Sequence, residues 1–122
     1  RKANLWFTTL FGGGCVFPSG EDSMWLLEAR RKGLTIFVSK ETIGTVSFDT
    51  SSWFTGYNEK FFYGKGAYCA ASHKRFCSIW CLYYLFRFSN VGEMSIVEKY
   101  KWIRRGKKGY HNMVSYDEYA AR

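Results

Sequence analysis

The chain has 122 residues, of which 47% are apolar and 20% aromatic, and its formal net charge at pH 7 is +8. This length suits one domain, and the apolar content with a single proline excludes disordered, collagen-like and low-complexity proteins. The charge is uneven: residues 1–60 hold 7 Lys/Arg and 6 Asp/Glu, whereas residues 61–122 hold 11 and 4. The second half is therefore expected to face phosphates of a nucleic acid, an anionic lipid or a nucleotide sugar.

The first half predicts strands around one helix. Residues 5–11 are aromatic and β-branched, as in a strand, and three glycines follow. A helix is expected over residues 21–32, since acids open it, cations close it and Gly33 comes next. Residues 34–38 and 42–48 then predict two strands. This order indicates the edge of an α/β layer with too few strands for a complete doubly wound sheet.

The second half predicts three helices, over residues 57–72, 75–88 and 93–105. The middle helix is apolar nearly all round, which indicates either a packed core or a helix lying in a membrane interface, and it is too short to span a bilayer. The third helix places lysines and arginines around Tyr100 and Trp102. That composition is typical of surfaces against anionic lipid, with a solvated basic face as the alternative.

The four cysteines contain no C-x-x-C pair, so free thiols in a reducing compartment fit best. Cys69, His73, Cys77 and Cys81 recur every four residues, as metal ligands on one helix face would. On a single helix, however, they would extend over about 18 Å, too far for one zinc ion. We therefore favour buried thiols, and a metal would need a broken helix or a second chain.

One stretch carries candidate chemistry. Glycines 12–14 permit backbone conformations closed to other residues, and Gly20 precedes the adjacent carboxylates Glu21 and Asp22 at a helix start. Carboxylates in this position can face a ligand at the rim of an α/β layer. Alternatively, they only stabilise the first turn of the helix.

The order of these motifs resembles the C-terminal part of family 2 glycosyltransferases, enzymes with the GT-A fold that build bacterial surface polysaccharides. The resemblance extends roughly over residues 7–110. It rests on runs of sequence that follow one another in the family's order: Gly12-Gly13-Gly14, Gly20-Glu21-Asp22, Lys32-Gly33-Leu34-Thr35-Ile36, Ile43-Gly44-Thr45-Val46 and Ser52-Trp53-Phe54-Thr55-Gly56-Tyr57-Asn58-Glu59-Lys60. It implies an α/β fragment, namely the edge of a GT-A type sheet with a helix and two strands, followed by a C-terminal helical segment.

The resemblance also implies an activity, the inverting transfer of a sugar from a nucleotide-diphosphate donor to an acceptor hydroxyl. Asp22 would be the general base, because a carboxylate within hydrogen-bond reach can take the proton of a weakly nucleophilic hydroxyl. Glu21 would orient the acceptor or the base. The residues expected to line the substrate cleft are Gly12, Gly13, Gly14, Trp53, Tyr57, Asn58 and Lys60.

The family's Asp-x-Asp motif, which holds a divalent metal (magnesium or manganese) on the donor, has no counterpart here, since the only aspartates are Asp22, Asp49 and Asp117. Relatives also carry a histidine near the position of Val46 or Ser47, which this chain lacks. We therefore expect the nucleotide-binding half to lie upstream of Arg1, and the chain alone to be inactive.

The expected organisation is a C-terminal part of the catalytic domain (residues 1–50), a helical, acceptor-side and membrane-proximal segment (51–110) and a tail (111–122). Expected partners are the nucleotide-sugar donor, a glycan or lipid-linked acceptor and an anionic membrane surface, with no nucleic acid. The expected location is cytoplasmic, at the inner face of the membrane. The alternative is a non-enzymatic basic and aromatic module that binds anionic membrane or single-stranded nucleic acid.

Overall fold

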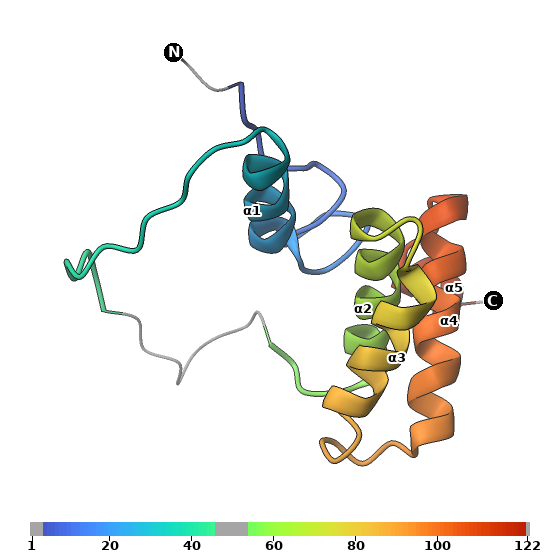
Figure 1. Ribbon diagram of the computed structural model, residues 1–122. Coiled ribbons are helices and arrows are strands. Elements are labelled where there is room, and N and C mark those ends of the chain that lie inside the picture. Colours follow the sequence, from blue (N-terminus) through green and yellow to red (C-terminus); the bar gives the residue numbers. More distant parts are fainter. Residues whose placement is uncertain (1–3, 46–53, 122) are drawn as a thin grey trace.

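The computed structural model describes residues 4–45 and 54–121, and helices account for 53% of them. Figure 1 shows α1 apart from a group of helices formed by the second half of the chain. The helices are α1 (Glu21–Arg31), α2 (Glu59–Ser72), α3 (Cys77–Arg87), α4 (Ile96–Asn112) and α5 (Tyr116–Ala120).

The predicted α/β class is wrong, because the described residues contain no strand and no sheet. Residues 5–11 form only one isolated bridge, between Phe11 and Phe17. Residues 34–45 follow α1 as a long, exposed segment without regular secondary structure (Figure 1). Residues 46–48, the end of the second predicted strand, lie outside the described residues. A β-strand needs a neighbouring strand whose N–H and C=O groups form hydrogen bonds with its own backbone. Residues 34–45 have the β-branched and aromatic composition of strands, but no described segment pairs with them.

The helix predictions are confirmed, with shifted boundaries. For α1, the acids Glu21 and Asp22 lie in the first turn, where they complement the helix dipole, and Arg30 and Arg31 lie in the last. Gly33 follows with φ +70°. Its left-handed conformation lets the Leu34 N–H donate to the Ala29 carbonyl at 3.0 Å, which closes the helix.

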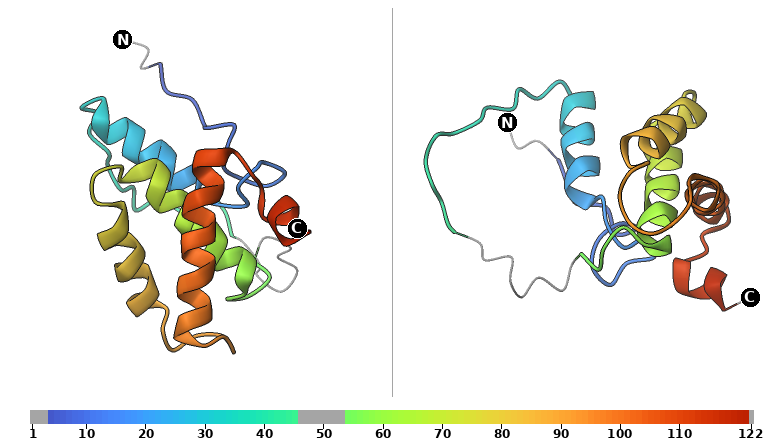
Figure 2. Two further views of the ribbon diagram at one scale, coloured as in Figure 1. Left: turned by 90° about the vertical axis from the view of Figure 1, so that its right-hand side faces the viewer. Right: turned by 90° about the horizontal axis from the view of Figure 1, so that it is seen from below.

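The α2 and α4 helices form the main packing pair of the molecule. They cross closely, as Figure 2 shows from the side. Gly66 of α2 lies against the Ile103 carbonyl, and Gly106 of α4 lies against the Tyr63 carbonyl, so a side chain at either position would overlap the partner's backbone. The buried side chains around this crossing include Phe62, Tyr63, Ala67, Trp102 and Ile103. The crossing of α2 and α4 is therefore the centre of the core.

The α3 helix lies beside this pair and is held at its end by a buried lysine. Lys99 of α4 is 1% exposed, and its Nζ donates to the carbonyl oxygens of Phe88 and Ser89 at 3.2 and 2.7 Å. These carbonyls follow the last turn of α3, where a cation is favoured. Lys99 thus joins the end of α3 to α4. Over the described residues, every helix is too short or too polar to cross a bilayer.

Candidate functional site

The three glycines lie in a tight loop whose two ends, at Phe11 and Phe17, are buried. The Phe17 N–H donates to the Leu10 carbonyl and the Gly12 N–H to the Phe17 carbonyl, each at 2.9 Å, so Phe11 and Phe17 are paired and buried. Gly12 and Gly14 adopt φ of +127° and +77°, which favour glycine over residues with a side chain. The turn leaves Gly13 and Gly14 exposed, and their backbone is open to a ligand.

The second segment of the site leads into α2. The side chain of Asn58 accepts a hydrogen bond from the Phe61 N–H at 3.1 Å, and its amide donates to the carbonyl and hydroxyl of Thr55 at 3.2 and 3.1 Å. Asn58 therefore caps the helix and fixes the turn before it. The sequence predicted a helix start at residue 57. The cap explains why α2 begins at Glu59.

These two segments, far apart in the chain, enclose one pocket of about 270 Å³. Its size is slightly below the usual range for small-molecule sites, about 300–1,000 Å³. Four of the residues predicted from the sequence to bind substrate line it: Gly13, Gly14, Asn58 and Lys60. The prediction missed the others: Pro18, Ser19, Phe54, Thr55, Gly56 and Phe61. Most of these lie in or beside the two sequence motifs, so taking each motif with its neighbours would have found them.

The two carboxylates lie beside the glycine loop. The Glu21 side chain packs over Gly12, where an added Cβ would lie 3.5 Å from the Glu21 carboxyl carbon. Asp22 is exposed on the first turn of α1. Neither residue lines the pocket itself. The structure thus brings the predicted acids and the predicted glycines together at the start of α1, and the same glycine loop lines the pocket through Gly13 and Gly14.

Tyr57 and Lys60, both predicted to bind substrate, also have structural contacts. Tyr57 packs its ring against Phe54, Phe61 and Phe88, with ring centroids 5.0 to 5.6 Å apart, and does not line the pocket. The Lys60 ammonium lies 3.8 Å from the Asp117 carboxylate and over the Tyr116 ring. Trp53 lies outside the described residues.

A cation lies next to the pocket. The Lys65 ammonium is 5.0 Å from the ring centroid of Phe61, a pocket residue, and 5.4 Å from that of Tyr84. Burial lowers the pKa of Lys65, and burial likewise raises the pKa of Tyr84 to about 12. Cation–π contacts of this kind are electrostatically favourable and stabilise the position of Phe61.

The cysteine and histidine stripe is divided by the break between α2 and α3. Cys69 belongs to α2, His73 follows its end, and Cys77 and Cys81 belong to α3. All three cysteines are buried free thiols, with 3.9 Å between the Sγ atoms of Cys77 and Cys81. A hydrogen bond from Cys69 lowers the pKa of Cys81. His73 stacks on Trp80 with ring centroids 4.4 Å apart.

The described part of the chain has no group of three or more histidine, cysteine or acidic side chains that could hold a metal ion. The residues present therefore do not fit the divalent metal implied by the resemblance.

Comparison with known proteins finds no family model, no curated protein and no solved structure that matches the chain. The assignment of a function therefore rests on the chemistry of the pocket and of the acids beside it.

Proposed function

We propose that the pocket between the glycine loop and the start of α2 binds the acceptor sugar in an inverting glycosyl transfer. The observation that carries the proposal is the convergence of the two sequence motifs, because Gly13 and Gly14 share one pocket with Asn58 and Lys60. The proposal depends on this site and not on a GT-A sheet, which the described residues do not form.

The lining suits a small polyhydroxylated ligand. Phe54 and Phe61 supply aromatic surface, with ring centroids 6.1 Å apart in an edge-to-face arrangement. Ser19 and Thr55 add hydroxyl groups, and Lys60 adds a donor. Ligand sites commonly combine apolar walls with a few polar groups that set the orientation. A sugar ring, with apolar C–H surfaces and hydroxyl edges, matches both kinds of lining.

The acids beside the glycine loop supply the chemistry in this proposal. Asp22 is the general base: its carboxylate takes the proton of the acceptor hydroxyl while the hydroxyl oxygen forms the new bond to the sugar carbon, and the nucleoside diphosphate leaves. Glu21, packed on Gly12, orients the loop and the acceptor. The exposed position of Asp22 leaves its carboxylate open to an acceptor that extends from the pocket.

The nucleotide-sugar donor is held, in this proposal, by a further polypeptide unit. Any magnesium or manganese on the diphosphate belongs to that unit, since the described residues do not fit a metal. We expect this chain alone to bind acceptors without transferring sugar. The four free cysteines support a reducing location, which we propose to be the cytoplasm.

The test is saccharide binding measured by saturation-transfer NMR with a panel of p-nitrophenyl pyranosides. At least one pyranoside should bind, and Phe54→Ala should weaken its binding about two- to tenfold, as loss of one aromatic contact does. Phe7→Ala is the matched control, because Phe7 is similarly exposed and stacks on Trp25, away from the pocket. No binding by the wild-type chain, or equal losses in the two variants, would refute the proposed site.

A further inference from the structure

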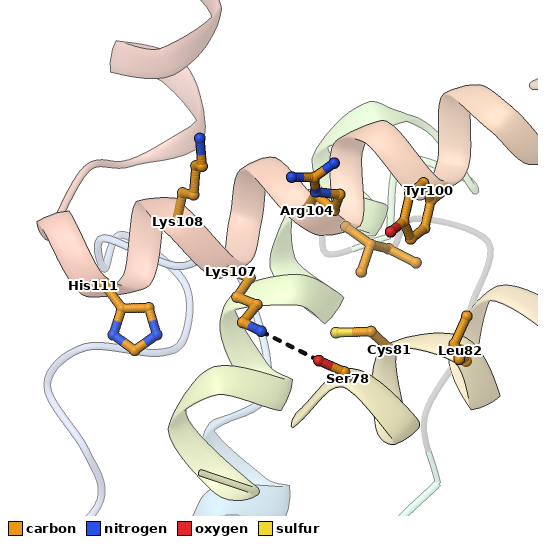
Figure 3. Close-up of a pocket in the computed structure, with 9 residues that line it drawn as sticks. Ser78, Cys81, Leu82, Tyr100, Arg104, Lys107, Lys108 and His111 are labelled. Carbon is orange, nitrogen blue, oxygen red and sulfur yellow. Dashed lines mark hydrogen bonds between the residues drawn. The ribbon is translucent and has the colours of Figure 1, made fainter. Parts of the chain in front are cut away.

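A second hollow lies between α3 and α4. It shares no lining residue with the pocket between the glycine loop and the start of α2, which we call the sugar pocket. It has a volume of about 580 Å³. The residues that line this α3–α4 groove, most of them labelled in Figure 3, are Ser78, Cys81, Leu82, Tyr100, Ile103, Arg104, Lys107, Lys108 and His111. The groove is larger than the sugar pocket and has a different chemistry.

One wall of the groove is cationic. Arg104, Lys107 and Lys108 come from α4 at positions three and four apart, which places them on one helix face together with Tyr100 and His111. The Lys107 ammonium donates to the Ser78 hydroxyl at 3.4 Å across the groove (Figure 3). Of the described residues that line the groove, none is acidic. The wall is therefore complementary to an anion such as a phosphate group.

The other wall is continuous with an exposed apolar helix face. The outer side of α3 carries Ile79, Leu82, Tyr83 and Phe86 at helical spacing, and these side chains are between 46% and 67% exposed. The inner side of α3 is also apolar, through the buried Cys77, Cys81 and Leu85. Leu82 belongs both to the outer face and to the groove. The apolar face and the cationic wall are thus neighbours on one surface.

We propose that this surface docks on an anionic lipid bilayer. The outer side chains of α3 enter the boundary between headgroups and acyl chains, and the lipid phosphate lies in the groove against Arg104, Lys107 and Lys108. An interfacial helix buries its apolar face there while cations meet the headgroups. A phosphate in the groove lies beside Ile103 and Leu82, which suits a ligand with an anionic head and an apolar body.

The aliphatic residues distinguish this partner from a nucleic acid. Single-stranded nucleic acid is bound by aromatic platforms on which bases stack, along a cationic track. Here Ile79 and Leu82 take part in the exposed face beside Tyr83 and Phe86, and an aliphatic side chain offers a base no stacking surface. The basic and apolar groups together therefore favour a membrane surface.

The experiment is flotation of the whole chain with vesicles made of equal parts phosphatidylcholine and phosphatidylglycerol, and with vesicles of phosphatidylcholine alone. The chain should float with the anionic vesicles, and high salt should weaken this binding. Replacing Arg104, Lys107 and Lys108 by glutamine should lower the binding constant roughly a hundredfold. The matched variant replaces Arg30, Lys32 and Lys40 by glutamine; it removes the same charge away from the groove and should keep most of the binding.

A second variant, Ile79→Ser with Phe86→Ser, tests the apolar face without touching the cations. Both side chains are more than 60% exposed, so this variant should keep its helical circular dichroism while losing about tenfold or more in vesicle binding. Equal effects of the two glutamine triples, unchanged binding by the serine variant, or tighter binding to a single-stranded oligonucleotide than to the anionic vesicles would overturn the proposal. Because this readout uses no sugar, it can fail while the sugar pocket stands.

Discussion

Two glycines set the distance between the main helices, and they allow a direct test at the residue scale. A Cβ at Gly66 would overlap the Ile103 carbonyl. Helix propensity favours alanine by about 1 kcal/mol, but overpacking costs about 1–3 kcal/mol or more, and here the cost is at the upper end because the overlapped atoms belong to the backbone of α4. Gly66→Ala should therefore lower the free energy of unfolding by about 2 kcal/mol, measured by urea denaturation. Gly44→Ala, with no neighbour within 4 Å, should change it by less than about 0.5 kcal/mol. Equal stability of the Gly66→Ala protein and the wild type would contradict the close crossing.

Lys99 is the buried charged residue that fastens the end of α3. Lys99→Met keeps much of the side-chain volume but leaves the carbonyls of Phe88 and Ser89 without their donor. Losing partners for buried acceptors costs about 1–3 kcal/mol, so the unfolding free energy should fall by about 2 kcal/mol. Lys101→Met, at an exposed position of the same helix, should change it little. If the two variants have equal unfolding midpoints, Lys99 does not hold α3.

Asp22 carries the proposed chemistry at the same scale. In the proposed transferase, which would combine this chain with a donor-binding unit, Asp22→Asn should reduce kcat about 10² to 10⁴-fold, the usual contribution of a general base. Donor binding should stay unchanged, because the proposed role of Asp22 is to act on the acceptor hydroxyl. Glu21→Gln should have the smaller effect on turnover. Loss of donor binding in Asp22→Asn, measured by calorimetry, would assign Asp22 a structural role instead.

At the scale of elements, the start of α4 gives a pH prediction. The Glu98 carboxylate accepts hydrogen bonds from the hydroxyl and the N–H of Ser95, at 2.7 and 2.9 Å. These bonds lower the pKa of Glu98 below its ordinary value of 4.5. A carboxyl group with a lowered pKa in the folded protein stabilises it above that ordinary value, and the contribution is lost as pH falls through the folded pKa.

The stability difference between the wild type and Glu98→Ala should therefore be largest near neutral pH and shrink below about pH 4.5. Glu98→Gln is the control, because glutamine can still accept from Ser95 but does not titrate. Thermal unfolding between pH 3 and pH 7 measures the difference. A gap between wild type and Glu98→Ala that stays constant across this range would contradict the role of the carboxylate in the capping box.

The helices could be predicted from sequence because their signals are local. For α1, the acids at one end, the cations at the other and Gly33 beyond define the helix within a single stretch of sequence. The strand predictions were wrong because the signal for a strand is not only local: a strand forms only when another segment, often distant in the sequence, pairs with it. Residues 34–45 have the composition of strands, yet no described segment pairs with them. The short α5 was missed because the tail has weak periodicity.

At the scale of the whole molecule, the candidate site could be predicted in part. The glycine loop and the segment before α2 were each recognisable as motifs, but only the fold brings Gly14 and Lys60 to one pocket. Asn58 was predicted as a substrate residue, and its hydrogen bonds also make it the cap of α2. The cations of α4 were predicted to face anionic lipid, but the groove itself was not predicted, because residues of both α3 and α4 form it. The spacing of Arg104, Lys107 and Lys108 on one face was its available signal.

The most direct test of the proposed function is an amide NMR titration of the chain with the pyranoside that binds best. The account predicts that shift changes appear together in two separate segments, at Gly13 and Gly14 and at Gly56 and Lys60, while α4 amides stay unchanged. Such a pattern would show that both motifs contact one sugar. Shift changes in only one of these segments, or centred on the groove beside Arg104, would contradict the shared sugar pocket.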